Sequence, residues 1–350
     1  MSSPLPDPGA DSPGPPFPPP DARSVEGVEG FTCDGSSRHP RLLADATALL
    51  DAELPDPRFV DTAHLRWTYH DNPDGPAWER YHYVADPRVG HLLVAHYANL
   101  PRSWRGPGGV RSPGVWSQNA VTRSGHQRAR HFTRLGLEIY AEAADAGRSF
   151  AVGVTNERST GAVVRYMGWH LVGPLPVCVV APLARPVRHG EGRAVTTDWL
   201  QSPDFDEFAA LVDRHPVGAW ATDWRPEVLR WRLAAPHVHY RVDVFDEVAV
   251  VSTRSRWGPV PAAVVLKIFP LVAGTAPVDA TRAVAAVARA HRAVFAVYAG
   301  FNRSVRVRGV RPPRRIQPSP LNLVVRALDP GVDHDTLELD TFEFLDMDAY

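Results

Sequence analysis

A short basic turn joins an apolar run to an amphipathic helix within Ala120–Phe150, and this stretch constrains the fold more than any other part of the sequence. The apolar positions recur at helical spacing, at Phe132, Leu135, Ile139 and Ala143. The turn before them contains Gln127, Arg128, Arg130 and His131. Free backbone N–H groups and the helix dipole favour an anion there, and arginine adds donors for phosphate oxygens. Taken alone, the window favours a solvated basic turn.

The segments after the helix change that interpretation. Phe150–Asn156 is a β-rich apolar run, and a short helical stretch follows that is broken by Gly168 before Trp169. Leu175–Val180 is typical of a further strand. The order is therefore strand, basic turn, helix, strand ending in asparagine, short helix, glycine–aromatic pair and strand.

This order and its motif residues resemble the GNAT superfamily of acyl-CoA-dependent N-acyltransferases, over roughly Asp61 to Val180. The family's pyrophosphate-binding turn has the form Q/R-x-x-G-x-G/A. The matching positions are Gln127, Arg128, Ala129, Arg130, His131 and Phe132. Asn156, Ser159 and the Gly168–Trp169 pair match later parts of the pattern, and Leu65–Gly75 looks like the Trp and Asn-Pro segment of larger members.

The turn departs from the family at two positions, because Arg130 replaces the first glycine and Phe132 the last small residue. Glycine normally lets the backbone approach a phosphate closely. Arg130 therefore either weakens an acyl-CoA site or contacts the phosphates itself. A weakened site would suit a carrier-protein donor, whose phosphopantetheine arm carries a single phosphate.

The resemblance implies an α/β (mixed α+β) fold, with a mostly antiparallel twisted sheet flanked by helices and two neighbouring strands that separate to admit a pantetheine arm. It implies attack of an amine on the thioester of acyl-CoA or acyl-phosphopantetheine, with a small-molecule or peptide amine as acceptor. The backbone of Ala120, Val121 and Thr122 would pair with the arm, and Gln127 to Phe132 would meet the phosphates. Asn156 and Ser159 would lie near the thioester.

The catalytic groups are harder to assign. Where many family members have a glutamate, the strand offers only Gln118 and Asn119, and the position of the family's acidic tyrosine is Val164. The candidates are Asn119, Glu157 and Tyr166, with His126 and His131 as further bases. A helix-capping role for Glu157, a core role for Tyr166 and a water relay without a dedicated base stay open. Trp67, Tyr69 and Trp78 are either core residues or a wall for the acyl chain or acceptor.

The second half of the chain echoes the first, which predicts two GNAT-like domains in tandem. Leu65-Arg66-Trp67 recurs as Leu229-Arg230-Trp231. A helix is expected at Thr281–Arg292, and Phe295–Asn302 after it echoes Phe150–Asn156. The stretch between Pro270 and Thr281 has no arginine and no Gln-led turn, so we place the donor site in the first half. The expected units are a Pro-rich disordered tail (1–30), the donor domain (31–185) and a degenerate domain (186–350).

Composition excludes several classes of function. The formal net charge is -1, which argues against a general nucleic-acid or membrane-surface binder. Cys33 and Cys178 are the only cysteines, so a reducing, cytoplasmic setting is expected without disulfides. No apolar run approaches the ~20 residues of a membrane helix. His237 and His239 are expected on one strand face without a third ligand, so no metal is predicted.

Two alternatives to a CoA-dependent enzyme stay open. One is an acyltransferase of secondary metabolism that takes its acyl group from an acyl carrier protein, which the basic segment Val305–Pro320 would grip. The other is a non-catalytic, degenerate GNAT binding module. The C-terminal alternation at Phe342 and Phe344 predicts a final edge strand with one buried face.

Overall fold

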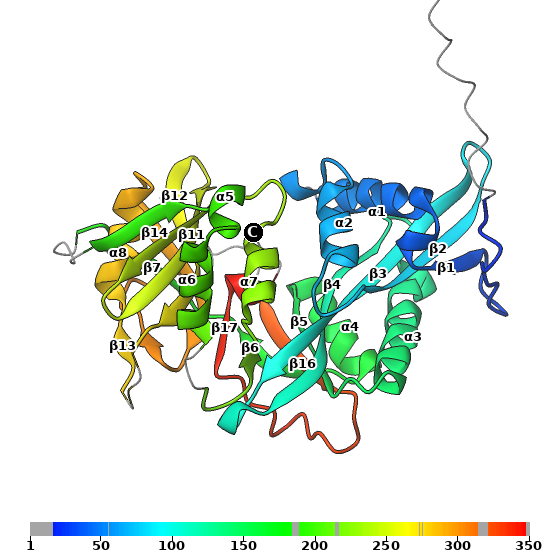
Figure 1. The fold of residues 1–350 in the computed structure, drawn as a ribbon. Coiled ribbons are helices and arrows are strands. Elements are labelled where there is room, and N and C mark those ends of the chain that lie inside the picture. The colour runs from blue at the N-terminus through cyan, green and yellow to red at the C-terminus, as the bar shows by residue number, and fades with distance from the viewer. Residues whose placement is uncertain are drawn as a thin grey trace, which may run out of the picture.

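The computed structural model describes residues 17–54, 56–183, 189–213, 217–272, 274, 276–313 and 321–347. Two β-sheets lie side by side, each covered by helices (Figure 1). None of the helices in these ranges is both long and apolar enough to cross a membrane.

The first sheet has eight strands in the order β1-β2-β3-β4-β5-β16-β6, with β9 pairing to β3. Only the β4–β5 pair is parallel, and the others are antiparallel. The strands are β1 Phe31–Asp34, β2 Trp78–Asp86, β3 Gly90–Arg105, β4 Arg111–Thr122, β5 Phe150–Thr155, β6 His170–Pro174, β9 Ala221–Thr222 and β16 Asn322–Ala327.

The second sheet has seven strands in the order β17-β14-β12-β11-β10-β8, with β7 pairing to β14. Again only one pair, β12–β14, is parallel. The strands are β7 Val177–Val180, β8 His189–Ala194, β10 Tyr240–Phe245, β11 Val248–Trp257, β12 Val260–Pro270, β14 Phe295–Asn302 and β17 Thr341–Glu343. A separate small pair joins β13 Val278–Asp279 to β15 Val305–Arg306.

The two sheets repeat one plan. The run β1-β2-β3-β4-β5 of the first corresponds to β8-β10-β11-β12-β14 of the second, and each run ends in its parallel pair. A helix precedes the last strand of the run in both copies. This helix is α3 His131–Asp145 before β5 and α8 Thr281–Ala290 before β14. The predicted tandem of two mixed α/β, mostly antiparallel domains is confirmed.

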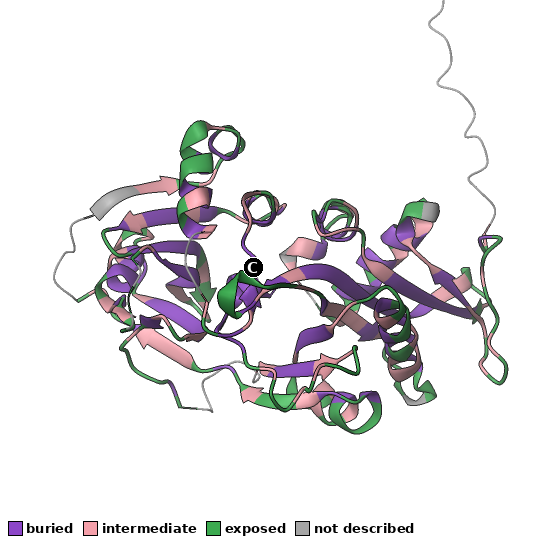
Figure 2. Ribbon diagram, turned by 60° about the horizontal axis from the view of Figure 1, so that its bottom comes forward, coloured by how far each residue is buried: buried purple, intermediate pink, exposed green. Residues whose placement is uncertain are grey.

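Helices cover both faces of each sheet. Most of the strand residues are therefore buried, whereas the outward sides of the helices are exposed (Figure 2). One core cluster packs α1 Pro40–Glu53 and α2 Ala63–His70 on the first sheet and continues to α5 Thr197–Leu200, α6 Pro203–Asp213 and α7 Pro226–Leu233 on the second. On the opposite faces, α3 and α4 Glu157–Met167 pack on the first sheet and α8 on the second. One hydrophobic core therefore runs through both halves.

Strands are exchanged between the halves. The first-half strand β7 pairs with β14 of the second sheet, whereas β16, near the C-terminus, inserts between β5 and β6 of the first sheet. Each sheet is thus completed by chain from the other half. The domain boundary at residue 185 stays a prediction. Each sheet contains strands from both sides of that boundary.

The repeated Leu-Arg-Trp triplets meet between the halves. Trp67 of α2 and Trp231 of α7 stack with ring centroids 4.6 Å apart and planes at 18°. Each indole N–H donates to the backbone carbonyl of the other tryptophan, at 3.1 and 3.2 Å. This reciprocal contact is what a local two-fold relation between two copies produces.

Three local expectations differ from the structure. Residues 17–30, assigned above to a disordered tail, are partly packed: the Phe17 ring lies 5.0 Å from that of Tyr83, and Arg23 bonds Asp34. Residues 1–16 lie outside the described ranges. The C-terminal strand β17 is short and buried at every residue, since both its faces are covered. The helix expected at Thr281–Arg292 ends at Ala290.

Candidate functional site

Strands β4 and β5 separate at their carboxyl ends. They pair in parallel only at Val115–Ala151, Trp116–Val152 and Ser117–Gly153. Among the described residues, no backbone hydrogen bond joins the two strands beyond Ser117. The β4 residues 117–120 are half-buried, although the residues just before them are fully buried. β4 and β5 therefore stop pairing where the resemblance predicts that two strands separate, and we call this place the β4–β5 opening.

A β-bulge in β4 lies beside this opening. Ala98 of β3 is opposite Gln118 and His96 is opposite Val121, so Asn119 and Ala120 together face a single residue. Asn119 has φ 51°, in the left-handed region that few non-glycine residues adopt. A bulge interrupts the ladder and bends the strand, and this one lies just after the last residue of β4 that pairs with β5.

The turn after β4 leads directly into helix α3. Gln127–Ala129 form one 3₁₀ turn, and Arg130 follows with φ 57° and ψ 19°. Arg130 therefore adopts the left-handed conformation that the family's glycine would adopt freely, at a cost of roughly 1 kcal/mol. Gln127, Ala129 and Arg130 are exposed, and Arg130 supplies no side-chain cap to the helix. The first N–H groups of α3 thus point toward an exposed basic turn.

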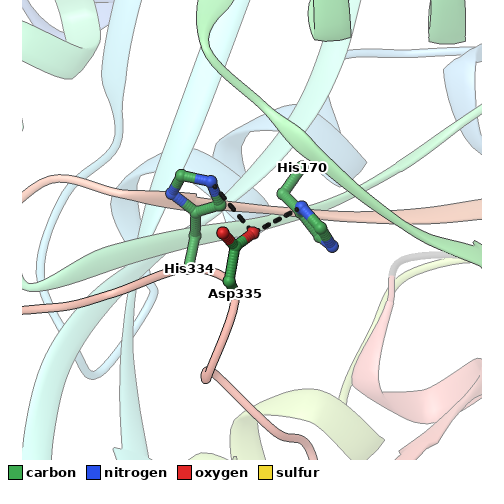
Figure 3. Close-up of side chains that lie close together, drawn as sticks. All are labelled: His170, His334 and Asp335. Atoms are coloured by element: carbon green, nitrogen blue, oxygen red, sulfur yellow. Dashed lines mark ion pairs between the residues drawn. The ribbon is translucent and has the colours of Figure 1, made fainter.

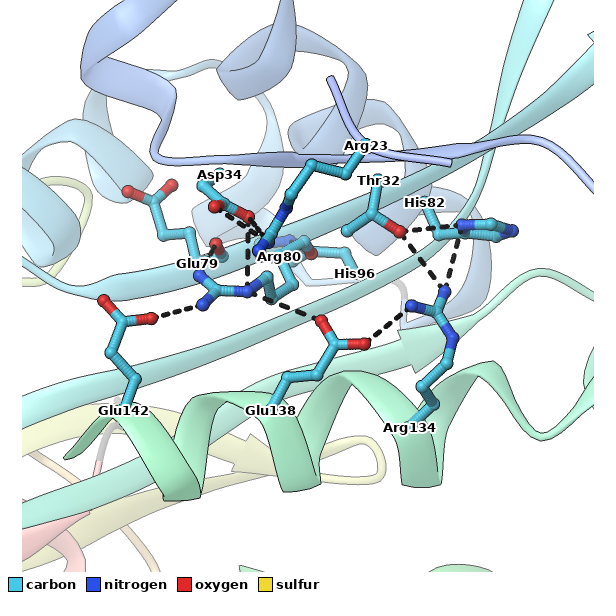
Figure 4. Close-up of polar contacts among 10 residues, drawn as sticks. All are labelled: Arg23, Thr32, Asp34, Glu79, Arg80, His82, His96, Arg134, Glu138 and Glu142. Carbon is cyan, nitrogen blue, oxygen red and sulfur yellow. Dashed lines mark hydrogen bonds and ion pairs between the residues drawn. The ribbon is translucent and has the colours of Figure 1, made fainter. Parts of the chain in front are cut away.

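Ion pairs on one side of α3 hold the helix against β1 and β2 (Figure 4). The buried guanidinium of Arg80 contacts Glu142, lies 3.2 Å from Asp34 and lies 3.8 Å from Glu138. Arg134 bonds Glu138 at 2.8 Å and also reaches His82. Because Arg80 is only 5% exposed, its charge would be costly without these carboxylates. The network fixes where the helix begins.

His131, the first residue of α3, points into the protein. Its ring lies 4.3 Å from the ring of His82 and is almost fully buried. Burial lowers the pKa of His131, and Arg134 and His126 lower it further. Burial likewise lowers the pKa of His82, to about 4. At the helix start, His131 therefore offers a backbone N–H, and its imidazole is neutral and packed.

A buried hydrogen-bond chain ends on Asn119. The Arg80 carbonyl, which can only accept, lies 3.1 Å from His96 Nδ1, so that nitrogen carries the proton. Burial lowers the pKa of His96 to about 4, which leaves Nε2 unprotonated at neutral pH. Tyr69 therefore donates to Nε2 at 2.9 Å, and its oxygen accepts from Asn119 Nδ2 at 2.9 Å. The chain fixes the orientation of the Asn119 amide.

Sequence reasoning did not single out His96. It lies in the apolar run Gly90–Arg105, where a lone histidine reads as part of a strand, and its partner Tyr69 comes from a helix earlier in the chain. No local spacing pattern connects the two. Only the fold brings them together, with Tyr69 fully buried and His96 1% exposed.

The candidates on α4 are spread over its first turn and its exposed face. Asn156 caps the helix, since its side chain accepts from the backbone N–H groups of Arg158 and Ser159 at 3.0 Å. The Ser159 hydroxyl donates back to Asn156 Oδ1 at 3.1 Å. Glu157 is exposed in the first turn, and Tyr166 is 54% exposed beneath the Arg165 guanidinium. Among the residues that the structure describes, no hydrogen bond or ion pair joins Glu157 or Tyr166 to Asn119.

The three aromatic candidates do not form one wall. Trp67 is buried against Trp231, and Tyr69 bonds His96 within the same core. Trp78 packs on the opposite face of the sheet, with the α3–α4 cluster and 5.2 Å from the Arg148 guanidinium. Proximity in sequence misleads here, because α2 and β2 send these side chains to different faces.

The corresponding opening in the second copy is closed by the chain's own C-terminal segment. Strands β12 and β14 stop pairing after Val265–Tyr298, and there β17 pairs with β14 while Glu343 accepts from the Ile268 N–H of β12 at 3.3 Å. Lys267, the only lysine of the chain, lies 3.0 Å from Glu343 and 2.6 Å from Asp346. All three side chains are buried.

A cavity of about 910 Å³ lies elsewhere in the second half, between β10 and helices α5 and α6. Trp199, Phe208 and Val242 line it together with acidic residues of α6. It contains no residue of β4, β5 or α3. It therefore does not belong to the opening in the first copy.

No protein-family model matches this chain, and no curated protein matches its sequence. Solved structures do match its fold. A conserved Enterococcus faecalis protein described as a probable N-acyltransferase is 9% identical, with TM-score 0.57, over 86% of this chain and 73% of that one. Saccharomyces cerevisiae N-myristoyltransferase with bound myristoyl-CoA is 10% identical, with TM-score 0.55, over 88% and 85%.

A GCN5-related N-acetyltransferase from Anabaena variabilis is 13% identical, with TM-score 0.53, over 83% of this chain and 71% of that one. At such identities the likeness concerns the fold alone. The chain has the fold of the GNAT superfamily across both of its halves, which confirms the predicted resemblance.

Proposed function

We propose that this protein transfers an acyl group from the thioester of acyl-CoA to an amine, at the opening between β4 and β5. The backbone of Ala120, Val121 and Thr122 would pair with the pantetheine arm, whose amides need partners in a sheet-like groove. The start of α3 and the side chains of Gln127 and Arg130 would hold the pyrophosphate. The solved N-myristoyltransferase holds myristoyl-CoA, which supports acyl-CoA as the class of donor.

The observation that carries this proposal is the difference between the two copies. In the first copy, β4 leaves β5 after Ser117, and an exposed turn that ends in Arg130 leads from β4 into α3. In the second copy, β17 and a buried ionic cluster occupy the matching place. This difference supports the end of the β4–β5 pair in the first copy as the place where a thioester arm would lie.

Asn119 is the side chain best placed to meet the reacting groups. Its Nδ2 donates to Tyr69, which leaves Oδ1 as the atom of this amide that would accept an N–H of the incoming amine. Holding the amine by this oxygen would orient its lone pair toward the thioester carbonyl. Tyr69 and His96 would then be positioning residues. Glu157 and Tyr166 stay predictions for proton transfer.

A carrier-protein thioester is the second candidate for the donor. The exposed Arg130, in place of the family's glycine, favours a donor with one phosphate. Part of the basic segment Val305–Pro320 lies outside the described residues. The shared chemistry of the two donors is a phosphorylated pantetheine thioester.

Thermal shift and mass spectrometry separate these possibilities. We expect acyl-CoAs to raise the melting temperature, because they bind only the folded state, and we expect acylated product from a panel of amines. A shift with acyl-phosphopantetheine but none with acyl-CoA would assign the donor to a carrier protein. A shift without any acylated product would identify a binding module, and the absence of every shift would contradict the proposed site.

A further inference from the structure

Two histidines and an aspartate meet at the edge of the first sheet (Figure 3). His170 is the first residue of the edge strand β6. His334 and Asp335 are consecutive residues of the crossover segment, residues 328–340, which carries the chain from β16 in the first sheet to β17 in the second. All three point toward one another, and one ligand atom from each lies within 4.8 Å of the others.

The distances suit coordination to a single ion. Asp335 Oδ1 lies 3.1 Å from His170 Nδ1 and 3.3 Å from His334 Nε2. Two ligands of a tetrahedral zinc ion, each bonded at about 2.0–2.1 Å, are roughly 3.3 Å apart. A small closure of the two imidazoles, whose ring centroids are 5.4 Å apart, would therefore bring all three atoms to bonding distance.

The chemistry and the exposure of the three groups also suit a metal. Neutral imidazole and carboxylate are ligands for divalent transition metals, and three protein ligands leave a position for water. The side chains of His170 and His334 are 41% and 42% exposed and that of Asp335 is 67% exposed, so an ion could enter from solvent. To bind the ion through Nδ1, His170 would carry its proton on Nε2 instead, and this change of tautomer releases no proton.

We propose that His170, His334 and Asp335 form a binding site for a divalent transition-metal ion, with zinc as the reference ion. The ion would fasten the crossover segment to β6. Within this segment the backbone is already shaped by Asp333, whose carboxylate accepts from the Asp335 N–H at 3.0 Å. Leu339 at its far end forms a bridge with Trp220. The ion would thus stabilise the route by which the chain crosses between the sheets, independently of acyl transfer.

A second histidine–aspartate contact, between His237 and Asp61, can be compared with the proposed metal site. His237 Nε2 lies 3.2 Å from Asp61 Oδ1, and both side chains are partly exposed. Among the described residues, no third ligand joins that pair in a metal-sized group. The pair His237 and His239, considered from sequence, precedes β10 and does not share a strand face, and His237 has φ 65°. The proposed site uses other histidines, His170 and His334.

The test is a zinc titration of the full-length protein against a chromophoric chelator, with the variants His334→Ala, His170→Ala and His237→Ala. The chain has 15 histidines, so the comparison between variants is the readout. We expect one ion per chain to bind tightest, to raise the melting temperature, and to bind at least about tenfold more weakly in His334→Ala and His170→Ala. His237→Ala should bind zinc like the unmodified protein.

Equal zinc affinity in all four proteins would overturn the proposal. So would a loss in His237→Ala as large as that in His334→Ala. Because all the substituted side chains are partly exposed, each variant should melt like the parent when a chelator is present, and that measurement verifies that any lost affinity is not lost folding.

Discussion

Single residues show most clearly which features a local sequence motif predicts and which depend on contacts between residues far apart in the sequence. Asn119 and Arg130 are both candidates from the sequence. Both adopt left-handed backbone conformations, Asn119 in the bulge of β4 and Arg130 at the start of α3. Their roles follow from positions within one continuous motif. The sequence leaves Trp67 open between a core role and a ligand wall, because its partner, Trp231, lies 164 residues away. His96 was missed for the same reason, since Tyr69 and His96 are joined by the fold and not by spacing.

The buried His96 should make stability fall in acid. Its pKa is about 4 in the folded protein and about 6.5 when unfolded, so the unfolded state binds one more proton between these values. Stability is therefore lost as pH falls from 6.5 toward 4, by at most about 1.4 kcal/mol per pH unit from this residue. Urea unfolding of His96→Gln at pH 7, 6 and 5 should show a flatter dependence. A slope equal to that of the parent protein would contradict the burial argument.

Removing the Tyr69 hydroxyl should lower the efficiency of the reaction with the amine and leave the affinity for the acyl donor unchanged. Tyr69→Phe keeps the buried ring but leaves Asn119 Nδ2 without its acceptor, so the amide can turn. We expect kcat/KM for the amine to fall about tenfold, with acyl-CoA affinity unchanged. Tyr83→Phe is the control, because the Tyr83 hydroxyl bonds Asp45 instead. Equal losses in the two variants would indicate a general packing effect.

At the scale of elements, helices and strands with a clear period were predictable. Helix α3 buries Leu135, Ile139 and Ala143, as its spacing predicts, and β5 and β14 lie where the echoed apolar runs are. The place of β16 was not predictable, because nothing in the residues of Asn322–Ala327 specifies a partner strand more than 160 residues earlier. Strand pairing across such separations depends on the whole fold.

Two glycines in neighbouring helices should respond oppositely to alanine. A Cβ on Gly136 of α3 would come within 2.3 Å of Met167 Cε and 3.0 Å of Tyr97, whose hydroxyl is held by Tyr140. A Cβ on Gly161 of α4 would meet nothing within 4 Å. We expect Gly136→Ala to lower the free energy of unfolding by about 1–3 kcal/mol and Gly161→Ala to raise it by up to about 1 kcal/mol. Denaturant unfolding measures both, and a stabilised Gly136→Ala would contradict the close packing of α3.

The whole molecule is two copies of one fold that complete each other. The repeat was visible in the sequence through its Leu-Arg-Trp triplets, but the exchange of β7 and β16 was not. The exchange and the shared core mean that neither half has a complete sheet by itself. The second copy keeps the fold, and its opening is occupied by β17.

The stacked side chains of Trp67 and Trp231 should contribute to the free energy of unfolding as a unit. Trp67→Ala and Trp231→Ala each remove the same stack, together with the hydrogen bond that the substituted indole donates, at a cost of about 3 kcal/mol. The double variant should therefore lose clearly less than the sum of the two. A double-mutant cycle by chemical unfolding measures this, and simple additivity would show that the two residues act separately.

The binding stoichiometry of acyl-CoA tests the central claim most directly. Calorimetric titration should find one site per chain, which is lost or strongly weakened in Arg130→Glu at the start of α3. The matched control is Arg282→Glu, the same charge reversal at an exposed position in the first turn of α8 in the closed copy, and it should bind like the parent protein. Two sites per chain, or equal effects of the two reversals, would contradict a single thioester site between β4 and β5.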